Sequence, residues 1–266
     1  MNTSILLHHP YLQVMKALIA RDIRLLRAQL LNHLIDALLL SVSSALLFSY
    51  LYPLIGISST QIAPLYIGSM VGLLFNFGGN FATRIAYDLK FYRRIDYYLT
   101  LPLSATALFA TFIISFIIEC ALVTVPATLL GLSLLKAPMC WAQVNWLGFF
   151  IMYTLTYLFF GLSFAWLAYQ YSFEWLMDNM WVRRASPLWY LSCTQFVWSQ
   201  VYLSWPSLGY LFLINPLTYA SEGMRSALLC SGPYIWWPWC ALAMIGFNGI
   251  MAYLLACAVN KRLQPV

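Results

Sequence analysis

Long uncharged apolar runs alternate with short charged segments along the whole chain. A helix needs about 20 apolar residues to cross the hydrocarbon core of a bilayer. Runs of this length predict an all-α integral membrane protein with six spans. The predicted spans are residues 37–55, 62–83, 103–126, 144–170, a fifth span that begins near Ala185, and 234–260.

Composition agrees with this class, because 62% of the 266 residues are hydrophobic and only 8% are charged. A soluble protein with so large an apolar core would need far more charge on its surface. The expected organisation is a segment 1–36, with an amphipathic helix and the entry to span one, followed by a membrane domain 37–266. The first residues lack the basic segment and apolar core of a secretory signal, so we expect them to be retained.

The distribution of cations predicts the orientation of the chain. Six spans place both termini on one side, and cytoplasmic segments of membrane proteins carry an excess of Lys and Arg. The opposite side carries only Lys136 and Arg225. We therefore expect cytoplasmic termini in a bacterial inner membrane, and the net charge of +6 needs no nucleic-acid partner. The cations expected in the cytoplasm are Lys16, Arg21, Arg24, Arg27, Arg84, Lys90, Arg93, Arg94, Arg183, Arg184, Lys261 and Arg262.

Residues 12–30 form an amphipathic pattern. At 100° per residue, Lys16, Arg21, Arg24 and Arg27 fall within an arc of about 140°, opposite a largely apolar face. Such a helix is expected to lie in the headgroup plane. Plain membrane anchoring and docking of a cytoplasmic partner both remain open.

The connection between spans two and three is the most charged segment of the chain. Thirteen residues, 84–96, carry six charged side chains of both signs, with four tyrosines in or just after them. Topology alone would require only cations, so a helix that docks on another protein is favoured over a solvated loop. The charged residues are Arg84, Asp88, Lys90, Arg93, Arg94 and Asp96.

Residues 185–221 carry no charge, and this run is too long for one span. We expect span five to end near Trp205 and a re-entrant pair of short helices to follow, broken at Asn215 and Pro216. Asn215 is a suitable N-cap, and Pro216 is suited to a first helical turn. Glu222 and Arg225 are three residues apart and can pair on one helix face. This predicts an outer gate with Tyr219 on it; the alternative is a pair of charges that face water.

Soluble enzyme chemistry is not indicated. No Gly is followed by Lys, so the chain has no phosphate-binding P-loop. His8, His9 and His33 lie near the N-terminus, and we expect them to be far from any acid cluster. The six cysteines contain no C-x-x-C pair, which disfavours a metal or redox site. A disulfide among Cys140, Cys230 and Cys240 stays open.

Glu119 is an acid well inside a predicted span. An intramembrane carboxylate indicates a functional site, although a structural hydrogen bond to a neighbouring helix is an equal alternative. Gly68 and Gly72 form a small-xxx-small pattern, which is a weak signal for close helix contact. The aromatic residues inside span four are expected to face lipid. They are Tyr153, Tyr157, Phe159 and Trp166.

Together, the amphipathic first helix, six spans, charged second connection and two motifs resemble the membrane subunit of an ABC-2 type exporter. The more specific motif is "NPLTYASEGMRSAL", with Asn215, Pro216, Tyr219, Glu222 and Arg225, and the weaker one is "LTLPLS" at 99–104. The resemblance covers nearly the whole chain. It implies a permease that forms a dimer, expected to be a homodimer, and binds two copies of a separate ATPase.

In that family, 84–98 would be the coupling helix, 10–28 the connecting helix and 207–230 the re-entrant helices. ATP and Mg²⁺ would bind the partner ATPase, and this chain would bind no cofactor. The cargo would be a drug-like or lipid-like amphiphile moved outward from the cytoplasm or inner leaflet, with a lipid-linked polysaccharide as the alternative. The rival class is an ion-coupled transporter or channel, which would favour several intramembrane acids and an internal repeat; a structural scaffold ranks third.

Overall fold

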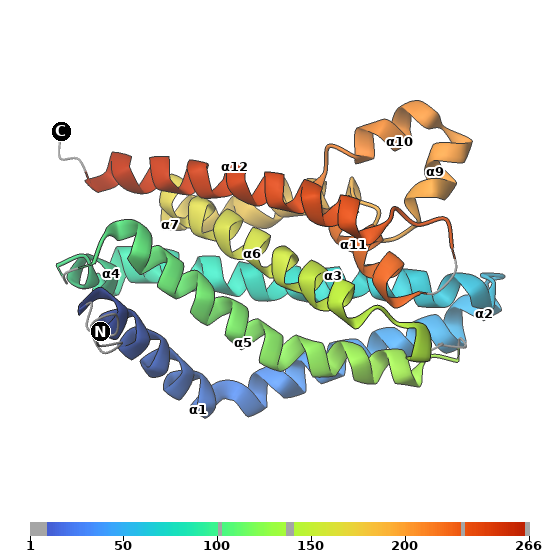
Figure 1. The fold of residues 1–266 in the computed structure, drawn as a ribbon, viewed down its shortest axis with the longest axis horizontal. Helices are drawn as coiled ribbons and strands as arrows, with labels where there is room; N and C mark the ends of the chain where they lie inside the picture. Colours follow the sequence, from blue (N-terminus) through green and yellow to red (C-terminus); the bar gives the residue numbers. More distant parts are fainter. Residues whose placement is uncertain (1–9, 101–102, 137–140, 230–231, 264–266) are drawn as a thin grey trace, which may run out of the picture.

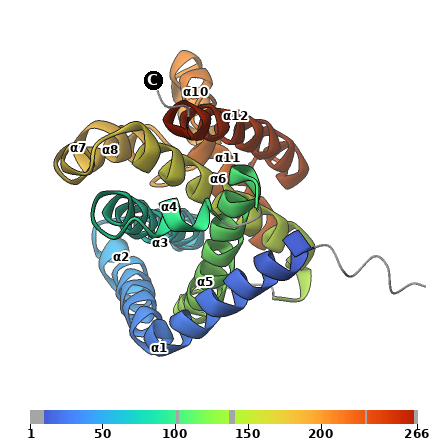
Figure 2. The ribbon, with the colours of Figure 1, turned by 90° about the vertical axis from the view of Figure 1, so that its left-hand side faces the viewer.

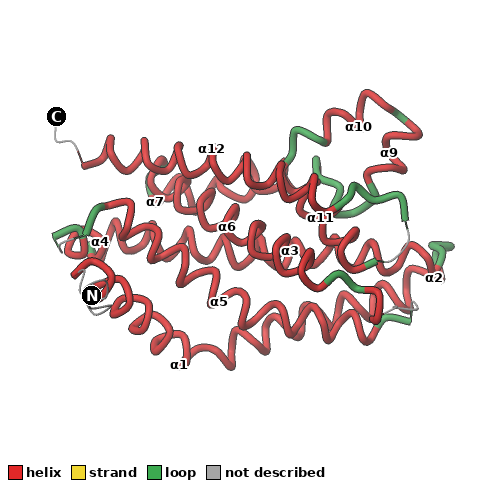
Figure 3. Tube along the Cα trace, viewed as in Figure 1, coloured by secondary structure: helices red, strands yellow, loops and turns green. Residues whose placement is uncertain are grey.

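The computed structural model describes residues 10–100, 103–136, 141–229 and 232–263, and these residues form helices and loops without strands (Figure 3). Five helical segments are long and apolar enough to cross a membrane. This is the architecture of a multi-pass membrane protein, and the all-α class is confirmed. The five segments are Gln13–Leu54, Ser59–Tyr92, Ala105–Leu134, Trp146–Gln170 and Trp237–Lys261.

The long helices lie side by side in one bundle (Figure 1). They are α1 (Pro10–Leu46), α3 (Ser59–Tyr87), α5 (Ala105–Leu134), α6 (Trp146–Gln170) and α12 (Trp237–Leu263). Helix α6 packs against α3, α5 and α12, and α1 packs mainly along α5 (Figure 2). Shorter helices connect them: η2 (Leu47–Leu51), α2 (Tyr52–Leu54), η3 (Asp88–Tyr92), α4 (Arg94–Tyr98), η4 (Trp141–Gln143), α7 (Phe173–Asn179), η5 (Met180–Ala185), α8 (Ser186–Tyr190), α9 (Trp198–Ser204), α10 (Pro206–Phe212) and α11 (Pro216–Leu228).

Aromatic residues of α6 fill the centre of the bundle. Tyr153, Tyr157 and Phe159 are almost fully buried. The Tyr153 hydroxyl lies 2.9 Å from Thr124 Oγ1 and 3.0 Å from Thr128 Oγ1, and Tyr157 donates to the Cys120 carbonyl at 3.2 Å. The expectation that these three rings face lipid was therefore wrong. The hydroxyl groups of Tyr153 and Tyr157 find partners on α5 across the core, which an apolar run does not reveal.

Helix α1 continues without a break through residue 36, where the amphipathic segment was expected to meet span one. It changes direction along its length (Figure 1). Helix α1 begins at the same end of the bundle at which α4 lies and α12 ends. We call this end the basic end, and we call the opposite end, where α11 and the start of α12 lie, the Arg225 end.

The predicted fifth span is not one helix, and the expectation of an unbroken crossing from Ala185 to Trp205 was wrong. Helix α8 ends at Tyr190, residues 191–197 are non-helical, and α9 begins at Trp198. The carbonyl groups of the non-helical residues accept hydrogen bonds from the Arg225 side chain instead of from a helical backbone. Irregular backbone of this kind is tolerated at membrane depth where protein covers it.

Candidate functional site

Asn215 and Pro216 begin α11 as the sequence predicts. The Asn215 Oδ1 atom accepts a hydrogen bond from Leu217 N at 3.0 Å, and Pro216 occupies the first turn. The Asn215 Nδ2 group also donates to the carbonyls of Leu188 (2.6 Å) and Leu191 (2.9 Å). One side chain thus caps the start of α11 and holds the end of α8, where helical carbonyl groups would otherwise lack donors.

The side chain of Arg225 lies at the Arg225 end and is fully buried. Its guanidinium group donates to Glu222 Oε1 at 2.8 Å. It also donates to four backbone carbonyls: Pro64 of α3 (2.8 Å), Cys193 (2.6 Å), Phe196 (2.9 Å) and Thr194 (3.0 Å). We call Arg225, Glu222 and the non-helical segment 191–197 the Arg225 clamp. A planar guanidinium with five donors suits this task, because each nitrogen meets an acceptor in a fixed direction.

Glu222 is also fully buried and is held on both sides. Beside Arg225, it accepts hydrogen bonds from Trp198 N at 3.0 Å and, more weakly, from Ile235 N at 3.4 Å. The pairing of Glu222 with Arg225 is confirmed, and the alternative that the two charges face water was wrong. A buried pair is tolerated only when hydrogen bonds satisfy both charges, which is the arrangement here.

Two glycines of α3 make room for the clamp and for the neighbouring helix α8. A methyl group at Gly68 would overlap the Thr194 carbonyl oxygen and the Arg225 side chain, and one at Gly72 would overlap the Trp189 ring. The small-xxx-small pattern thus marks a close contact between α3 and the residues around the break. Tyr219, expected to belong to the gate, lies near α12, with its ring 6.0 Å from that of Phe247.

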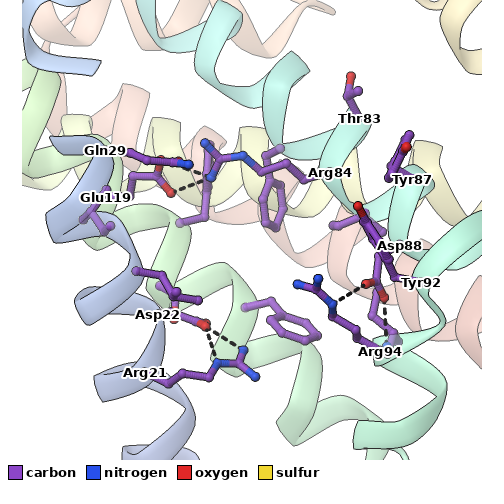
Figure 4. Close-up of a pocket in the computed structure, with 18 of the residues that line it drawn as sticks. Arg21, Asp22, Gln29, Thr83, Arg84, Tyr87, Asp88, Tyr92, Arg94 and Glu119 are labelled. Atoms are coloured by element: carbon purple, nitrogen blue, oxygen red, sulfur yellow. Dashed lines mark hydrogen bonds and ion pairs between the residues drawn. The ribbon is translucent and has the colours of Figure 1, made fainter. Parts of the chain in front are cut away.

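A pocket of about 850 Å³ lies at the basic end, between α1, α3, η3, α4 and α5. Three arginine–carboxylate pairs line it (Figure 4). Arg21 and Asp22 belong to α1, Arg84 of α3 reaches Glu119 of α5, and Asp88 lies near Arg94. The distances are 2.6 Å for Arg21–Asp22, 3.1 Å for Arg84–Glu119 and 4.0 Å for Arg94–Asp88.

Glu119 therefore lines a cavity and also pairs with a neighbouring helix, so both interpretations of this acid hold in part. In addition to Arg84, His33 of α1 contacts it, with Nδ1 3.1 Å from Oε1 but without hydrogen-bond geometry. His33 thus contacts one acid, whereas the expectation concerned a cluster of acids that could form a metal or catalytic site. The contact joins residues 86 positions apart, so no local pattern indicates it. His8 and His9 lie outside the described residues.

The segment 84–98 presents an exposed aromatic and cationic surface. Asp88 Oδ2 accepts a hydrogen bond from Ile95 N at 2.8 Å and so ties η3 to α4 across Arg93. Arg93 has a φ of 51°, in the left-handed region that non-glycine residues seldom adopt. Lys90 pairs with Glu174 of α7, a partner that sequence reasoning missed. The exposed residues are Arg84, Tyr87, Lys90, Phe91, Tyr92, Arg93, Arg94 and Tyr97; the side chain of Asp96 lies outside the described set.

The cations of the first helix divide into two groups. Lys16, Arg24 and Arg27 are exposed, whereas Arg21 is half-buried and donates to the hydroxyl of Tyr98, the last residue of α4. On the opposite face, Leu18 is buried against Leu103 and Leu108. Part of the predicted apolar face thus packs against α5, whereas Ile23 and Leu25 of the same face are exposed.

Within the described ranges, no group of three or more His, Cys, Asp or Glu residues is placed to hold a metal ion. Cys240 is buried with a free thiol. Cys140 and Cys230, the other candidates for a disulfide, lie outside the described residues. Comparisons of the chain with family models, with curated proteins and with solved structures find no match.

Proposed function

We propose that this chain is the membrane subunit of an ATP-driven exporter of the ABC-2 type, which moves an amphiphilic cargo outward. The observation that carries the proposal is the fold of the "NPLTYASEGMR" stretch. Its Asn215, Glu222 and Arg225 side chains hold together a break in the helical bundle, where non-helical backbone meets α3 and α11. Broken helices inside a membrane domain are typical of transport proteins, in which such segments line or close a pathway.

The basic end supplies the second half of the proposal. If it faces the cytoplasm, as its cations suggest, the exposed residues of 84–98 form the surface on which two copies of a separate ATPase dock on a permease dimer. The aromatic and arginine side chains of this segment are of the kind enriched in protein interfaces. The Arg225 clamp then acts at the outer side as a gate whose opening must separate α11 from residues 191–197.

The decisive test is co-purification with a separately encoded P-loop ATPase, followed by ATP hydrolysis with and without candidate cargo. We expect a stable complex whose hydrolysis is stimulated by an amphiphile. The double variant Arg93→Glu, Arg94→Glu should lose the complex while still inserting, because both side chains are exposed. The matched control is Arg183→Glu, an exposed cation of η5 outside this segment. Full ATPase recovery with the double variant would refute the docking surface.

Orientation can be tested by labelling from outside in a cysteine-free background. Ser133→Cys, near the end of α5, should react, and Ser172→Cys, just before α7, should not. Both serines are exposed, so accessibility within the protein does not limit either reaction. Labelling of Ser172→Cys alone would reverse the orientation.

An ion-coupled transporter is the second candidate, because the side chains of Glu119, Arg84 and His33 form a polar cluster between α1, α3 and α5. Intramembrane groups of this kind mark proton relays in other proteins. The two candidates differ in their energy source. Cargo movement into vesicles that is driven by a pH gradient, without any ATPase, would favour this class and reject the exporter.

A further inference from the structure

The pocket at the basic end has charged groups and apolar walls within one cavity. Its arginine and carboxylate side chains come from five different elements, so the pocket exists only in the folded bundle. Between the charges lie the rings of Phe81, Phe112 and Phe116, together with Leu25 and Leu26 of α1. A cavity of about 850 Å³ is within the range that binds small molecules in proteins.

In each ion pair around the pocket, the arginine side chain is more exposed than the carboxylate side chain. The side chain of Arg84 is 51% exposed and that of Glu119 is 15% exposed. Arg94 is 61% exposed against 15% for Asp88, and Arg21 is 33% exposed against 20% for Asp22. Although the pairs balance in formal charge, each arginine side chain that lines the pocket is therefore more open to solvent than its carboxylate partner.

Exposed guanidinium groups recognise oxyanions, because their N–H donors match the geometry of phosphate and carboxylate oxygens. A phosphate has more free oxygens than a carboxylate and so can accept from more than one arginine at once. The phenylalanine rings and leucines beside these donors suit an apolar body attached to the anion. A loose pair such as Arg94–Asp88, at 4.0 Å, can also release its guanidinium at low cost.

We propose that this pocket binds an amphiphile whose headgroup carries a phosphate, with Arg84 and Arg94 on the phosphate and the phenylalanine rings against the apolar part. The ligand can be a membrane lipid or a soluble amphiphile, since both offer the same chemistry. Only the role of this ligand as cargo rests on the proposed exporter function. Binding itself is a property of this chain and needs no ATPase.

The test is equilibrium binding of radiolabelled dodecyl phosphate to the purified full-length chain in dodecyl maltoside. We expect saturable binding that dodecanol and inorganic phosphate do not displace at the same concentration. Dodecanol lacks the phosphate group, and inorganic phosphate lacks the apolar chain. Arg84→Gln and Arg94→Gln should each weaken binding at least tenfold. Arg94→Gln keeps the assay interpretable if loss of Arg84 unfolds the chain, because Arg94 is largely exposed. The matched control is Arg24→Gln, on the same helix as Arg21 but outside the pocket, which should bind as the wild type does.

Phosphatidylglycerol vesicles distinguish the two sources of the ligand. Displacement of dodecyl phosphate by the vesicles supports a lipid headgroup in the pocket, and binding that resists the vesicles supports a soluble amphiphile. The proposal fails if inorganic phosphate or dodecanol displaces the probe as well as dodecyl phosphate does. It also fails if Arg24→Gln weakens binding as much as Arg94→Gln does. If the chain binds the probe but recruits no ATPase, the exporter proposal fails and this site stands.

Discussion

Arg225 and Arg94 each lie beside a carboxylate, at opposite ends of the same bundle, yet water reaches only one of them. Arg225 is fully buried, with one carboxylate oxygen and four carbonyl oxygens as acceptors. Arg94 is 61% exposed and lies 4.0 Å from Asp88. The first arginine holds the backbone in place, whereas the second is free to meet a ligand or a partner. A buried arginine thus fixes the backbone around it, whereas an arginine that solvent reaches keeps its donors available for a ligand or a partner protein.

The largest loss of stability is expected for Arg225→Met. This change leaves the Glu222 charge buried without its partner, and loss of one partner of a buried pair costs about 3–5 kcal/mol. Four carbonyl groups lose a donor as well. Thermal unfolding of the purified protein should show a markedly lower midpoint temperature, while Arg94→Met should change it little because an exposed pair contributes about 0–1 kcal/mol. Equal shifts for the two variants would remove the contrast between the ends.

A reciprocal exchange, Glu222→Arg with Arg225→Glu, sharpens the comparison. If mutual pairing were all that mattered, the exchange would partly restore stability and transport. At position 225, however, a carboxylate would face the carbonyls of Pro64, Cys193 and Thr194, which are all acceptors. We therefore expect the exchange to be no more stable than Arg225→Met. Recovery to near the wild-type midpoint would show that the pair, and not the carbonyl contacts, is what Arg225 provides.

Gly68→Ala should lower the free energy of unfolding by an intermediate amount, about 1–3 kcal/mol, because overpacking forces neighbouring groups to move. The added methyl group would overlap the Thr194 carbonyl and Arg225. Gly246→Ala in α12 is the control, since no atom lies within 4 Å of the added group there. Alanine is the better helix former, so this control should not lower the unfolding midpoint. A tolerated Gly68→Ala would mean that the clamp can relax.

The smallest loss of stability is expected for Glu174→Gln at the basic end. A hydrogen bond from Lys90 lowers the pKa of Glu174 below its ordinary value. The stabilisation is therefore present at pH values above the ordinary glutamate pKa of about 4.3 and is lost as the pH falls through the lowered pKa. The midpoint of Glu174→Gln should lie slightly below that of the wild type at neutral pH and merge with it in acid. A difference that grows in acid would contradict this assignment.

The sequence by itself predicts the parts of this protein that depend on local physics. Five of the six predicted spans correspond to long apolar helices, because hydrocarbon length and backbone hydrogen bonding constrain every residue of such a run. The cap at Asn215 and Pro216 and the pair Glu222–Arg225 are predicted for the same reason, since their partners lie within three residues.

Only the tertiary structure decides what these elements contact. The hydrogen bond from Arg225 to Pro64 joins residues 161 positions apart, and those to Cys193 and Thr194 span about thirty. These bonds replace helical ones within residues 191–197, which is why an uncharged run that predicts a continuous span is broken there. The contact of His33 with Glu119 and the pocket beside it arise in the same way. Hydropathy records how much apolar surface a segment must bury, but a buried polar group is satisfied by whichever partner the packed bundle brings to it.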